Sequence, residues 1–386
     1  MRRAIGVVTV ARSDYGHLLS LLAALEADSD VELGVFVAGS HLSTRFGWTA
    51  DLVEADGWPI AARIDMGIDD DAPAAIATAT GRGVTGFAEV FARHRPDLLV
   101  VLGDRYEMLA AALAALPFAL PVAHLHGGEV TEGAIDEQIR HAITKLAHLH
   151  FVAAEAYAAR VRQLGEEPWR VHCCGAPGLD RLQARAALSR EALGARLGGP
   201  LGRPTLLVTF HPETLAAGDV PRQAEELTAA LEKVDGNIVA TAPGADTAHG
   251  AITAALERLA ARRPATRVVT TLGDEVYCSL LREADVMVGN SSSGLIEAPT
   301  FGLPVVNVGD RQRGRLRATN VLDVPAEREA IAEAIGRALE PGFRRGLAGL
   351  VNPYGDGNAA PRIARVLREV ELGPRLTRKR FVDRPA

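Results

Sequence analysis

Residues 98–150 read LLVVLGDRYEMLAAALAALPFALPVAHLHGGEVTEGAIDEQIRHAITKLAHLH. Two apolar runs in this stretch, residues 98–102 and 121–125, have the hydrophobic character of parallel strands that are buried on both faces. Each run is followed at once by polar residues, Gly103-Asp104-Arg105 after the first and His126-Gly127-Gly128-Glu129 after the second. Because parallel strands end at the same edge of a sheet, we expect both polar groups at the carboxyl edge, where open α/β sheets bind ligands.

The rest of the chain continues this alternation of strands and helices. Strands are predicted at residues 4–10, 31–38, 58–64, 148–153 and 171–174, and a cluster of turn residues at 189–204 interrupts the pattern before it resumes. The alternation predicts an α/β fold with two doubly wound, Rossmann-like parallel-sheet domains. We place the first domain at residues 1–185, completed by a C-terminal helix at 360–386. The second domain is placed at residues 186–359, with the substrate expected in a cleft between the two.

Composition excludes several classes of protein. A chain of 386 residues with 48% hydrophobic residues can form two cores, and the net charge of −6 provides no basic surface for nucleic acid. Three cysteines, two of them adjacent at Cys173 and Cys174, make neither a disulfide framework nor a CxxC pair, so a reducing cytoplasm is expected and zinc is not. Pro117 and Pro121 break the uncharged run at residues 108–123, which favours a helix, a turn and a strand over a membrane span.

The sequence VMVGNSSSG at residues 286–294 predicts a strand that leads into a helix through small and polar residues. A helix N-terminus has free backbone N–H groups and a positive end, and small residues allow a phosphate to approach them. A single serine would be enough to cap the helix. Three serines flanked by glycines favour a phosphate site, with Ser291, Ser292 and Gly294 as contacts. Glu297, one turn further along, is placed to accept hydrogen bonds from ribose hydroxyls.

Two more polar residues follow predicted strands. Arg12 lies in a predicted turn at residues 12–16, where it would clamp a phosphate or lie on the surface as an ordinary arginine. His211 follows the first strand of the second domain, where it would contact phosphate, transfer a proton near neutral pH, or be a capped loop histidine. Residues 81–86 match GxGxxG, but the residues before them predict a helix, which argues against dinucleotide binding.

Asp104, Glu129 and Asp136 are the acids expected near the carboxyl edge of the first domain. Each alone could cap a helix, but three together favour chemistry, because crowding and partial burial would raise the pKa of some of them and divide them into acids and bases. His124 and His126 share a strand face and could ligate a metal with Glu129. No further ligand follows at a regular spacing, however, and His124 is expected to be a core histidine.

A diphosphate site in one domain and a group of acids in the other suit a sugar attached to a nucleotide. The chain has no GxxxxGK[ST] loop and no lysine-rich phosphate contacts, so chemistry on the sugar is favoured over phosphoryl transfer. Removal of a proton from carbon needs a positioned base, and loss of a nucleotide needs cations or helix ends near the leaving group.

Together these motifs resemble the hydrolysing UDP-N-acetylglucosamine 2-epimerases of bacterial sialic-acid synthesis. The matching motifs, in the family's order, are RSDYG at 12–16, GDRYE at 103–107, HLHGGE at 124–129, IDE at 135–137, RHAITK at 140–145, HPET at 211–214, GNSSSGLIE at 289–297 and NVGDRQRG at 307–314. The resemblance implies a GT-B-type fold, a homodimer, and no metal or redox cofactor. It also implies conversion of UDP-N-acetylglucosamine and water to N-acetylmannosamine and UDP, through removal of the C2 proton, loss of UDP to give a 2-acetamidoglucal, and rehydration.

The resemblance further implies roles for individual residues. Asp104 and Asp136 match catalytic acids of the family, and Arg105 matches a substrate-side arginine. The family's nucleotide contacts fall on Arg12, His211, Ser291, Ser292, Glu297 and Arg311.

This chain departs from many relatives at two places, and other functions fit parts of the pattern. His126 stands where many relatives have a catalytic glutamate, so the proton-transfer role falls either to His126 or to Glu129. Residues 10 and 11 are Val-Ala where many relatives have a glycine before the arginine, which would narrow the phosphate turn. The alternatives are the same chemistry on UDP-2,4-diacetamido-2,4,6-trideoxyhexose, a non-hydrolysing epimerase, a UDP-sugar-binding regulator and a glycosyltransferase.

Overall fold

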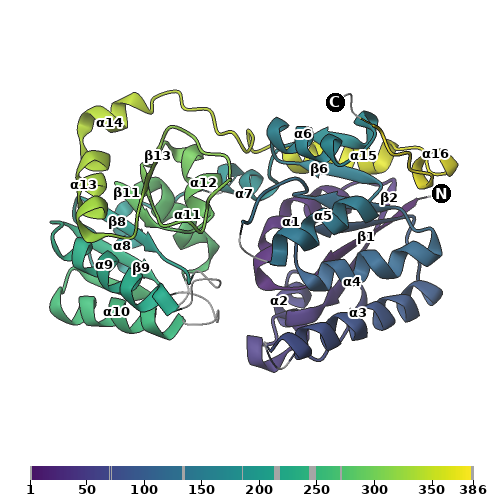
Figure 1. The fold of residues 1–386 in the computed structure, drawn as a ribbon, viewed down its shortest axis with the longest axis horizontal. Helices are drawn as coiled ribbons and strands as arrows, with labels where there is room; N and C mark the ends of the chain where they lie inside the picture. Colours follow the sequence, from purple (N-terminus) through teal and green to yellow (C-terminus); the bar gives the residue numbers. More distant parts are fainter. Residues whose placement is uncertain are drawn as a thin grey trace. The chain divides into compact units, whose positions relative to one another are not determined.

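The computed structural model of the chain divides into two compact units (Figure 1). It describes residues 2–68, 70, 72–132, 135–184, 186–212, 218–242, 249–269 and 272–383. Unit 1 comprises Met1–Glu129, Ile135–Arg181 and Tyr354–Ala386, and unit 2 comprises Val130–Ala134 and Leu182–Pro353. These limits differ from the expected domains by a few residues, and they assign the short segment after Glu129 to unit 2.

The described residues of unit 1 form one parallel sheet with the strand order β3-β2-β1-β4-β5-β6-β7. Its strands are β1 (Arg3–Thr9), β2 (Val31–Ala38), β3 (Ile60–Ile64), β4 (Leu98–Leu102), β5 (Val122–Leu125), β6 (Leu149–Val152) and β7 (Val171–Cys173). The register pairs Val7 of β1 with Val35 of β2 and with Val100 of β4. All residues of β4 and β5 are buried, as expected for central strands of a parallel sheet that is covered on both faces.

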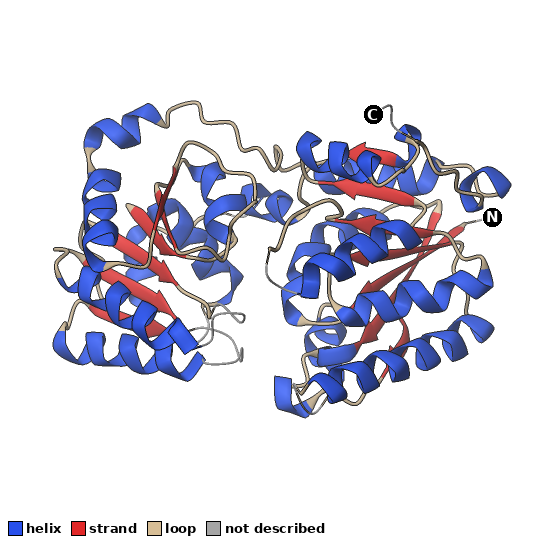
Figure 2. Cartoon of the chain, in the orientation of Figure 1, coloured by secondary structure: helices blue, strands red, loops and turns tan. Residues whose placement is uncertain are grey.

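Helices cover this sheet (Figure 2). They are α1 (Arg12–Glu26), α2 (Ala50–Ala55), α3 (Pro73–Arg93), α4 (Tyr106–Ala115), α5 (Ile135–Leu146), α6 (Glu155–Gln163), α15 (Ala359–Glu369) and α16 (Pro374–Thr377), and α7 (Gly178–Ala184) crosses the boundary between the units. Helices α3, α4 and α5 pack in sequence against one another, while α1 packs beside α15. The C-terminal α15 therefore contributes to the core of unit 1.

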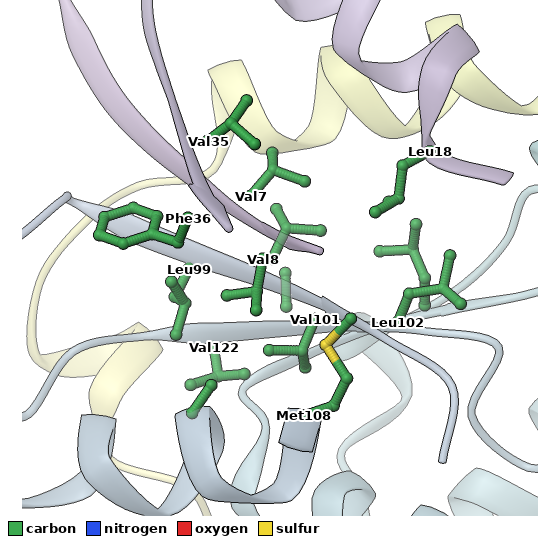
Figure 3. Close-up of a cluster of buried hydrophobic side chains, with 14 of the residues drawn as sticks. Val7, Val8, Leu18, Val35, Phe36, Leu99, Val101, Leu102, Met108 and Val122 are labelled. Atoms are coloured by element: carbon green, nitrogen blue, oxygen red, sulfur yellow. The ribbon is translucent and has the colours of Figure 1, made fainter. Parts of the chain in front are cut away.

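The core of unit 1 forms where β1, β2 and β4 meet α1 and α4 (Figure 3). Val8, Val101 and Met108 are fully buried there. At about 25 cal/mol per Å² of apolar surface removed from water, burial of each such side chain contributes about 1.5–3 kcal/mol to stability. The core fixes the strands, and through them the position of the residues that follow each strand.

The described residues of unit 2 form a second parallel sheet, with the order β10-β9-β8-β11-β12-β13. Its strands are β8 (Thr205–Thr209), β9 (Asn237–Thr241), β10 (Thr266–Val269), β11 (Val286–Gly289), β12 (Val305–Val308) and β13 (Val321–Val324). Its helices are α8 (Arg190–Arg196), α9 (Val220–Glu232), α10 (His249–Arg262), α11 (Gly273–Glu283), α12 (Ser293–Ile296), α13 (Arg328–Leu339) and α14 (Pro341–Gly346). No helix in the described part of the chain is long and apolar enough to span a membrane.

Three elements differ from the sequence predictions. The predicted turn at residues 12–16 is the first turn of α1, because Asp14 accepts a hydrogen bond from the backbone N–H of Val10 just before the helix. Helix α8 lies in the stretch predicted as turns, with Ser189 capping it by accepting a hydrogen bond from the N–H of Ala192. Strand β13 was missed because its residues are only half-buried at the sheet edge.

Candidate active site

The strand order of each sheet reverses at one place, between β1 and β4 in unit 1 and between β8 and β11 in unit 2. Open α/β sheets bind ligands beyond the carboxyl ends of the strands at such a switch point. Every strand pair in both sheets is parallel, so residues that follow these strands share one edge. The predicted site residues of each unit follow strands at or next to its switch point.

A buried polar network follows β1. The Asp14 carboxylate accepts hydrogen bonds from the Thr9 hydroxyl (2.7 Å) and the Val10 N–H (3.0 Å). Because the Thr9 hydroxyl donates to Asp14, its 2.9 Å contact with His41 has the imidazole Nε2–H as donor, and His41 Nδ1 accepts from Thr49. Burial raises the pKa of Asp14 to about 6 and lowers that of His41 to about 4. Near neutral pH the network therefore contains an ionised acid and a neutral histidine.

Arg105 is held by a second buried carboxylate. Its Nε and Nη2 donate to the two carboxylate oxygens of Glu107 at 3.1 and 2.7 Å, and Nη2 also contacts Ser40 Oγ at 3.4 Å. Glu107 is fully buried, while a third of the Arg105 side chain is exposed. Burial alone would lower the pKa of Arg105, but the charge and hydrogen bonds of Glu107 together with the charge of Asp14 outweigh it and raise the pKa. The guanidinium is thus a fixed cation at the end of β4.

Asp104, the residue before Arg105, forms an ion pair with the guanidinium of Arg140 on α5. Arg140 is buried, and its Nη1 also donates to a Glu137 carboxylate oxygen at 3.0 Å and to the backbone carbonyl of Glu129 at 3.1 Å. One arginine therefore connects the ends of β4 and β5 to α5. Asp104 and Glu137 therefore both face the Arg140 guanidinium, in contrast to the expected crowding of carboxylate against carboxylate.

His126 and Glu129 form a pair in the turn after β5. The Glu129 carboxylate accepts a 2.6 Å hydrogen bond from His126 Nδ1. His126 has a φ of 61°, a left-handed conformation that is uncommon for residues other than glycine. The His17 ring lies nearby, with its centroid 6.2 Å from that of His126. The structure thus brings together the two residues between which the sequence left the proton-transfer role open.

Asp136 and Arg12 are less constrained. Asp136 is half-buried in the first turn of α5, four residues before Arg140, so the two lie on the same face of the helix. Arg12 is exposed in the first turn of α1. His124 differs from both: it is buried, its Nε2–H donates to the Gly103 carbonyl at 2.7 Å, and Nδ1 accepts from Thr144. Both of its nitrogens are occupied, so it has no free atom for a metal.

In unit 2, Asn290 joins the ends of β8 and β11. Its side chain exchanges two hydrogen bonds with the backbone of His211, accepting from the N–H at 2.7 Å and donating to the carbonyl at 2.9 Å. Its own carbonyl accepts from Arg311 Nη1 at 3.2 Å and from Gln312 at 2.9 Å. Asn290 therefore positions two of the predicted nucleotide contacts. Residues 213 and 214 of the HPET motif lie outside the described residues.

The seryl turn consists of residues 290–294. Within the described part of the chain, the backbone N–H groups of Ser291 and Ser292 make no hydrogen bond, and Ser292 does not cap α12 with its side chain. Ser293 uses its hydroxyl internally: it donates to Glu297 and accepts from the half-buried Tyr277 at 2.7 Å. Two serine N–H groups are thus left for a ligand.

Two glycines allow the backbone to take this path. Gly289 has a φ of +137°, and a Cβ there would lie 2.0 Å from the carbonyl oxygen of Thr209. A Cβ on Gly294 would lie 2.9 Å from Val305, so this residue permits α12 to pack closely on β12. Helix α12 has only four residues and is followed by a 3-10 turn over Ala298–Phe301.

A family model described as UDP-N-acetylglucosamine 2-epimerase matches residues 23–368 of the chain, well over half of the chain's length. The chain belongs to the UDP-N-acetylglucosamine 2-epimerase family. The resemblance inferred from the motifs is therefore confirmed.

Among the relatives in this family, a Legionella pneumophila protein named UDP-N,N'-diacetylbacillosamine 2-epimerase (hydrolyzing) is 36% identical, over 98% of this chain and 99% of that protein. A Neisseria meningitidis protein named UDP-N-acetylglucosamine 2-epimerase is 32% identical, over 97% and 98%. A solved structure of UDP-GlcNAc 2-epimerase from Neisseria meningitidis bound to UDP-GlcNAc matches with a TM-score of 0.80 at 18% identity, covering 95% of this chain and 99% of that one. This match and the two parallel sheets confirm the predicted GT-B-type fold.

Several polar residues of this epimerase-family chain were not assigned a role from the sequence: Asp14, Glu107, Arg140 and Asn290. Each lies inside a motif that was recognised, within a few residues of a predicted site residue. Asp14, Glu107 and Asn290 share one signal, a charged or amide side chain within a few residues of the end of a strand, whereas Arg140 lies in the middle of α5. The spacing does not reveal which of these side chains turns inward, because that depends on contacts with other strands and helices. Among the described residues, no three His, Cys, Asp or Glu side chains are grouped to hold a metal ion.

Proposed function

We propose that the protein hydrolyses UDP-N-acetylglucosamine to N-acetylmannosamine and UDP. The observation that carries the proposal is the chemistry at the carboxyl edges of the two sheets. Asp104 is paired with the buried Arg140 after β4, and the described seryl turn after β11 presents two serine N–H groups. Family membership supports the reaction class, and the Neisseria relative supports this sugar as the substrate.

In this proposal unit 2 binds the nucleotide. The N–H groups of Ser291 and Ser292 donate to the diphosphate, and His211 and Arg311, both bonded to Asn290, contact it as well. Glu297 accepts hydrogen bonds from the ribose. Negative charge grows on the diphosphate as it leaves, so fixed donors aimed at it lower the barrier to its departure.

Unit 1 acts on the sugar. Arg12 and Arg105 contact the substrate, and Asp104 and Asp136 serve as catalytic acids. A base of the enzyme takes the proton from C2, the C2–H electron pair becomes the C1=C2 double bond, and the C1–O electron pair leaves with UDP. Water then adds its oxygen at C1, and C2 receives a proton on the opposite face, which gives N-acetylmannosamine.

A second substrate is favoured by a specific observation. The Legionella relative, at 36% identity against 32% for the Neisseria protein, is named as acting on UDP-N,N'-diacetylbacillosamine. This sugar differs from N-acetylglucosamine at C4 and C6, whereas the elimination and hydration involve only C1 and C2. The same residues would therefore perform the reaction on either sugar.

The test is incubation of the protein with each UDP-sugar in deuterated water, followed by proton and phosphorus NMR. We expect free UDP and an epimerised sugar with deuterium at C2, and we expect neither with Asp104→Asn. An epimerised product that retains UDP would show the non-hydrolysing reaction instead. Release of UDP without any change at C2 would contradict epimerisation.

A further inference from the structure

The turn after β5 is held in place from three sides. The His126 N–H donates to the Phe151 carbonyl of β6 at 3.0 Å, Arg160 of α6 donates to the Gly128 carbonyl, and Arg140 of α5 donates to the Glu129 carbonyl. A Cβ on Gly128 would lie 2.5 Å from the Tyr157 carbonyl oxygen, so the backbone of the turn passes too close to α6 for a side chain at this position. It keeps His126 in its left-handed conformation, an unfavourable backbone state of the kind that clusters at functional sites.

The hydrogen bond to Glu129 fixes the tautomer of His126. A carboxylate oxygen can only accept, so Nδ1 carries the proton in the 2.6 Å bond. In the neutral imidazole the other nitrogen, Nε2, then carries the lone pair. A carboxylate that orients a histidine in this way is the arrangement by which proteins prepare an imidazole base.

His126 Nε2 is buried and has no hydrogen-bond partner among the described residues. Leaving a ring nitrogen buried and unsatisfied is costly, and native proteins rarely do so without a reason. If His126 had only a structural role in the turn, its Nδ1 hydrogen bond alone would fulfil that role. Glu129 is itself buried, with its carboxylate on His126.

The geometry points to His126 as the catalytic residue that removes the proton from C2 of the sugar, with Glu129 as its positioning residue. This inference rests on the proposed function and assigns one of its two proton-transfer roles. In the elimination direction, Nε2 forms an N–H bond with the proton of C2, the C2–H electron pair becomes the C1=C2 double bond, and the C1–O electron pair departs with UDP. In the hydration step water oxygen bonds to C1, and C2 receives its proton on the opposite face from a second acid of the enzyme, so His126 takes part only in the removal.

The first test compares His126→Gln with His126→Glu, using the UDP-sugar on which the wild type is active. Glutamine has similar bulk but cannot accept a proton, and we expect it to lower kcat by about 10²- to 10⁴-fold, the usual contribution of general acid–base catalysis. A carboxylate can accept the proton, so His126→Glu should recover part of the turnover and of the deuterium uptake at C2. His94→Gln, an exposed histidine at the end of α3, is the matched control and should leave kcat unchanged.

Two outcomes separate the proposals. If the wild type releases no UDP from either UDP-sugar, the proposed function is wrong and this inference falls with it. If the wild type is active and His126→Gln keeps full kcat, only the assignment of His126 is overturned.

The second test does not depend on turnover or on the stability of a His126 variant. The tautomer of His126 is measured by NMR of the wild-type protein labelled with ¹⁵N-histidine. We expect Nδ1–H in the wild type and in Glu129→Gln, whose amide oxygen still accepts the bond, and a change of tautomer in Glu129→Ala. Turnover should fall in the order wild type, Glu129→Gln, Glu129→Ala, with little change in KM because Glu129 touches His126 and not the substrate. An Nε2–H tautomer in the wild type would refute the inference.

Discussion

At the scale of single residues, Arg140 joins the acid groups of unit 1. Its guanidinium bonds to Asp104, to Glu137 and to the carbonyl of Glu129. Arg140→Lys keeps the charge but loses the planar fork that makes these bonds together. Because misplacing a reacting group by an ångström can cost about 100-fold, we predict a loss in kcat of that order with a small change in KM. Gln138→Ala, a change on the same helix, should leave both constants unchanged; equal losses in the two variants would contradict the prediction.

Asp14 makes the free energy of unfolding depend on pH. Burial raises its pKa from 3.8 to about 6. Unfolding therefore releases a proton between about pH 4 and 6, so this group lowers the free energy of unfolding as pH rises through that window, by about 3 kcal/mol above it. Asp14→Asn keeps the acceptor for Thr9 and Val10 and removes the ionisation. Urea unfolding should show the variant gaining about 3 kcal/mol on the wild type between pH 4 and pH 8, and an equal difference at both pH values would refute this.

At the scale of elements, the carboxyl end of β11 depends on Gly289. A side chain there would meet the Thr209 carbonyl oxygen of β8 at 2.0 Å, in a φ region that disfavours any residue but glycine. We predict that Gly289→Ala destabilises the protein by about 1–3 kcal/mol and weakens UDP binding, because the seryl turn begins at the next residue. Urea unfolding and calorimetric titration with UDP would measure both effects.

The control for this element is a glycine with room around it. Gly336 is exposed in α13, and a Cβ at this position would have no atom of the described residues within 4 Å outside its own helix backbone. Gly336→Ala should stabilise the protein by about 0.5–1 kcal/mol through higher helix propensity and leave UDP binding unchanged. If Gly336→Ala also weakened UDP binding, the loss of affinity in Gly289→Ala could not be attributed to the seryl turn.

At the scale of the whole molecule, a buried arginine helps to fasten the C-terminal segment to the rest of unit 1. Arg170 donates to the backbone carbonyls of three residues of that segment, Arg375, Leu376 and Arg378, at 2.7–3.2 Å. It also pairs with Glu167 at 2.7 Å. We predict that Arg170→Ala lowers the free energy of unfolding by roughly 3 kcal/mol, because buried acceptors lose their donor.

The matched control is Arg196→Ala. Its guanidinium is 63% exposed and lies 3.8 Å from Glu275, so its loss should change stability by less than about 0.5 kcal/mol. Proteolysis of the folded protein adds a second readout, since release of the C-terminal segment in Arg170→Ala should expose it to cleavage. An equally stable and equally resistant Arg170→Ala variant would refute the role of this contact.

The sequence alone determined the layers and the strands of this protein. An uninterrupted apolar run such as residues 98–102 is typical of a parallel strand that is buried on both faces. Strand β4 was therefore predicted with the limits that the structure has. Motifs and their order were enough to identify the family, and they placed Asp104, His126 and Glu129 at strand ends. Half-buried β13, by contrast, carries a weaker pattern and was missed.

Only the tertiary structure decided which polar groups meet. Asn290 bonds to His211, 79 residues away, because β8 and β11 become neighbours in the sheet. Arg140 pairs with Asp104, 36 residues earlier in the chain, because α5 packs near the end of β4. The same holds for the tautomer of His126 and the raised pKa of Asp14, because hydrogen bonding and burial depend on every element packed around a group. Local sequence fixes what each side chain can do, whereas the packing of distant segments fixes its partner and its charge.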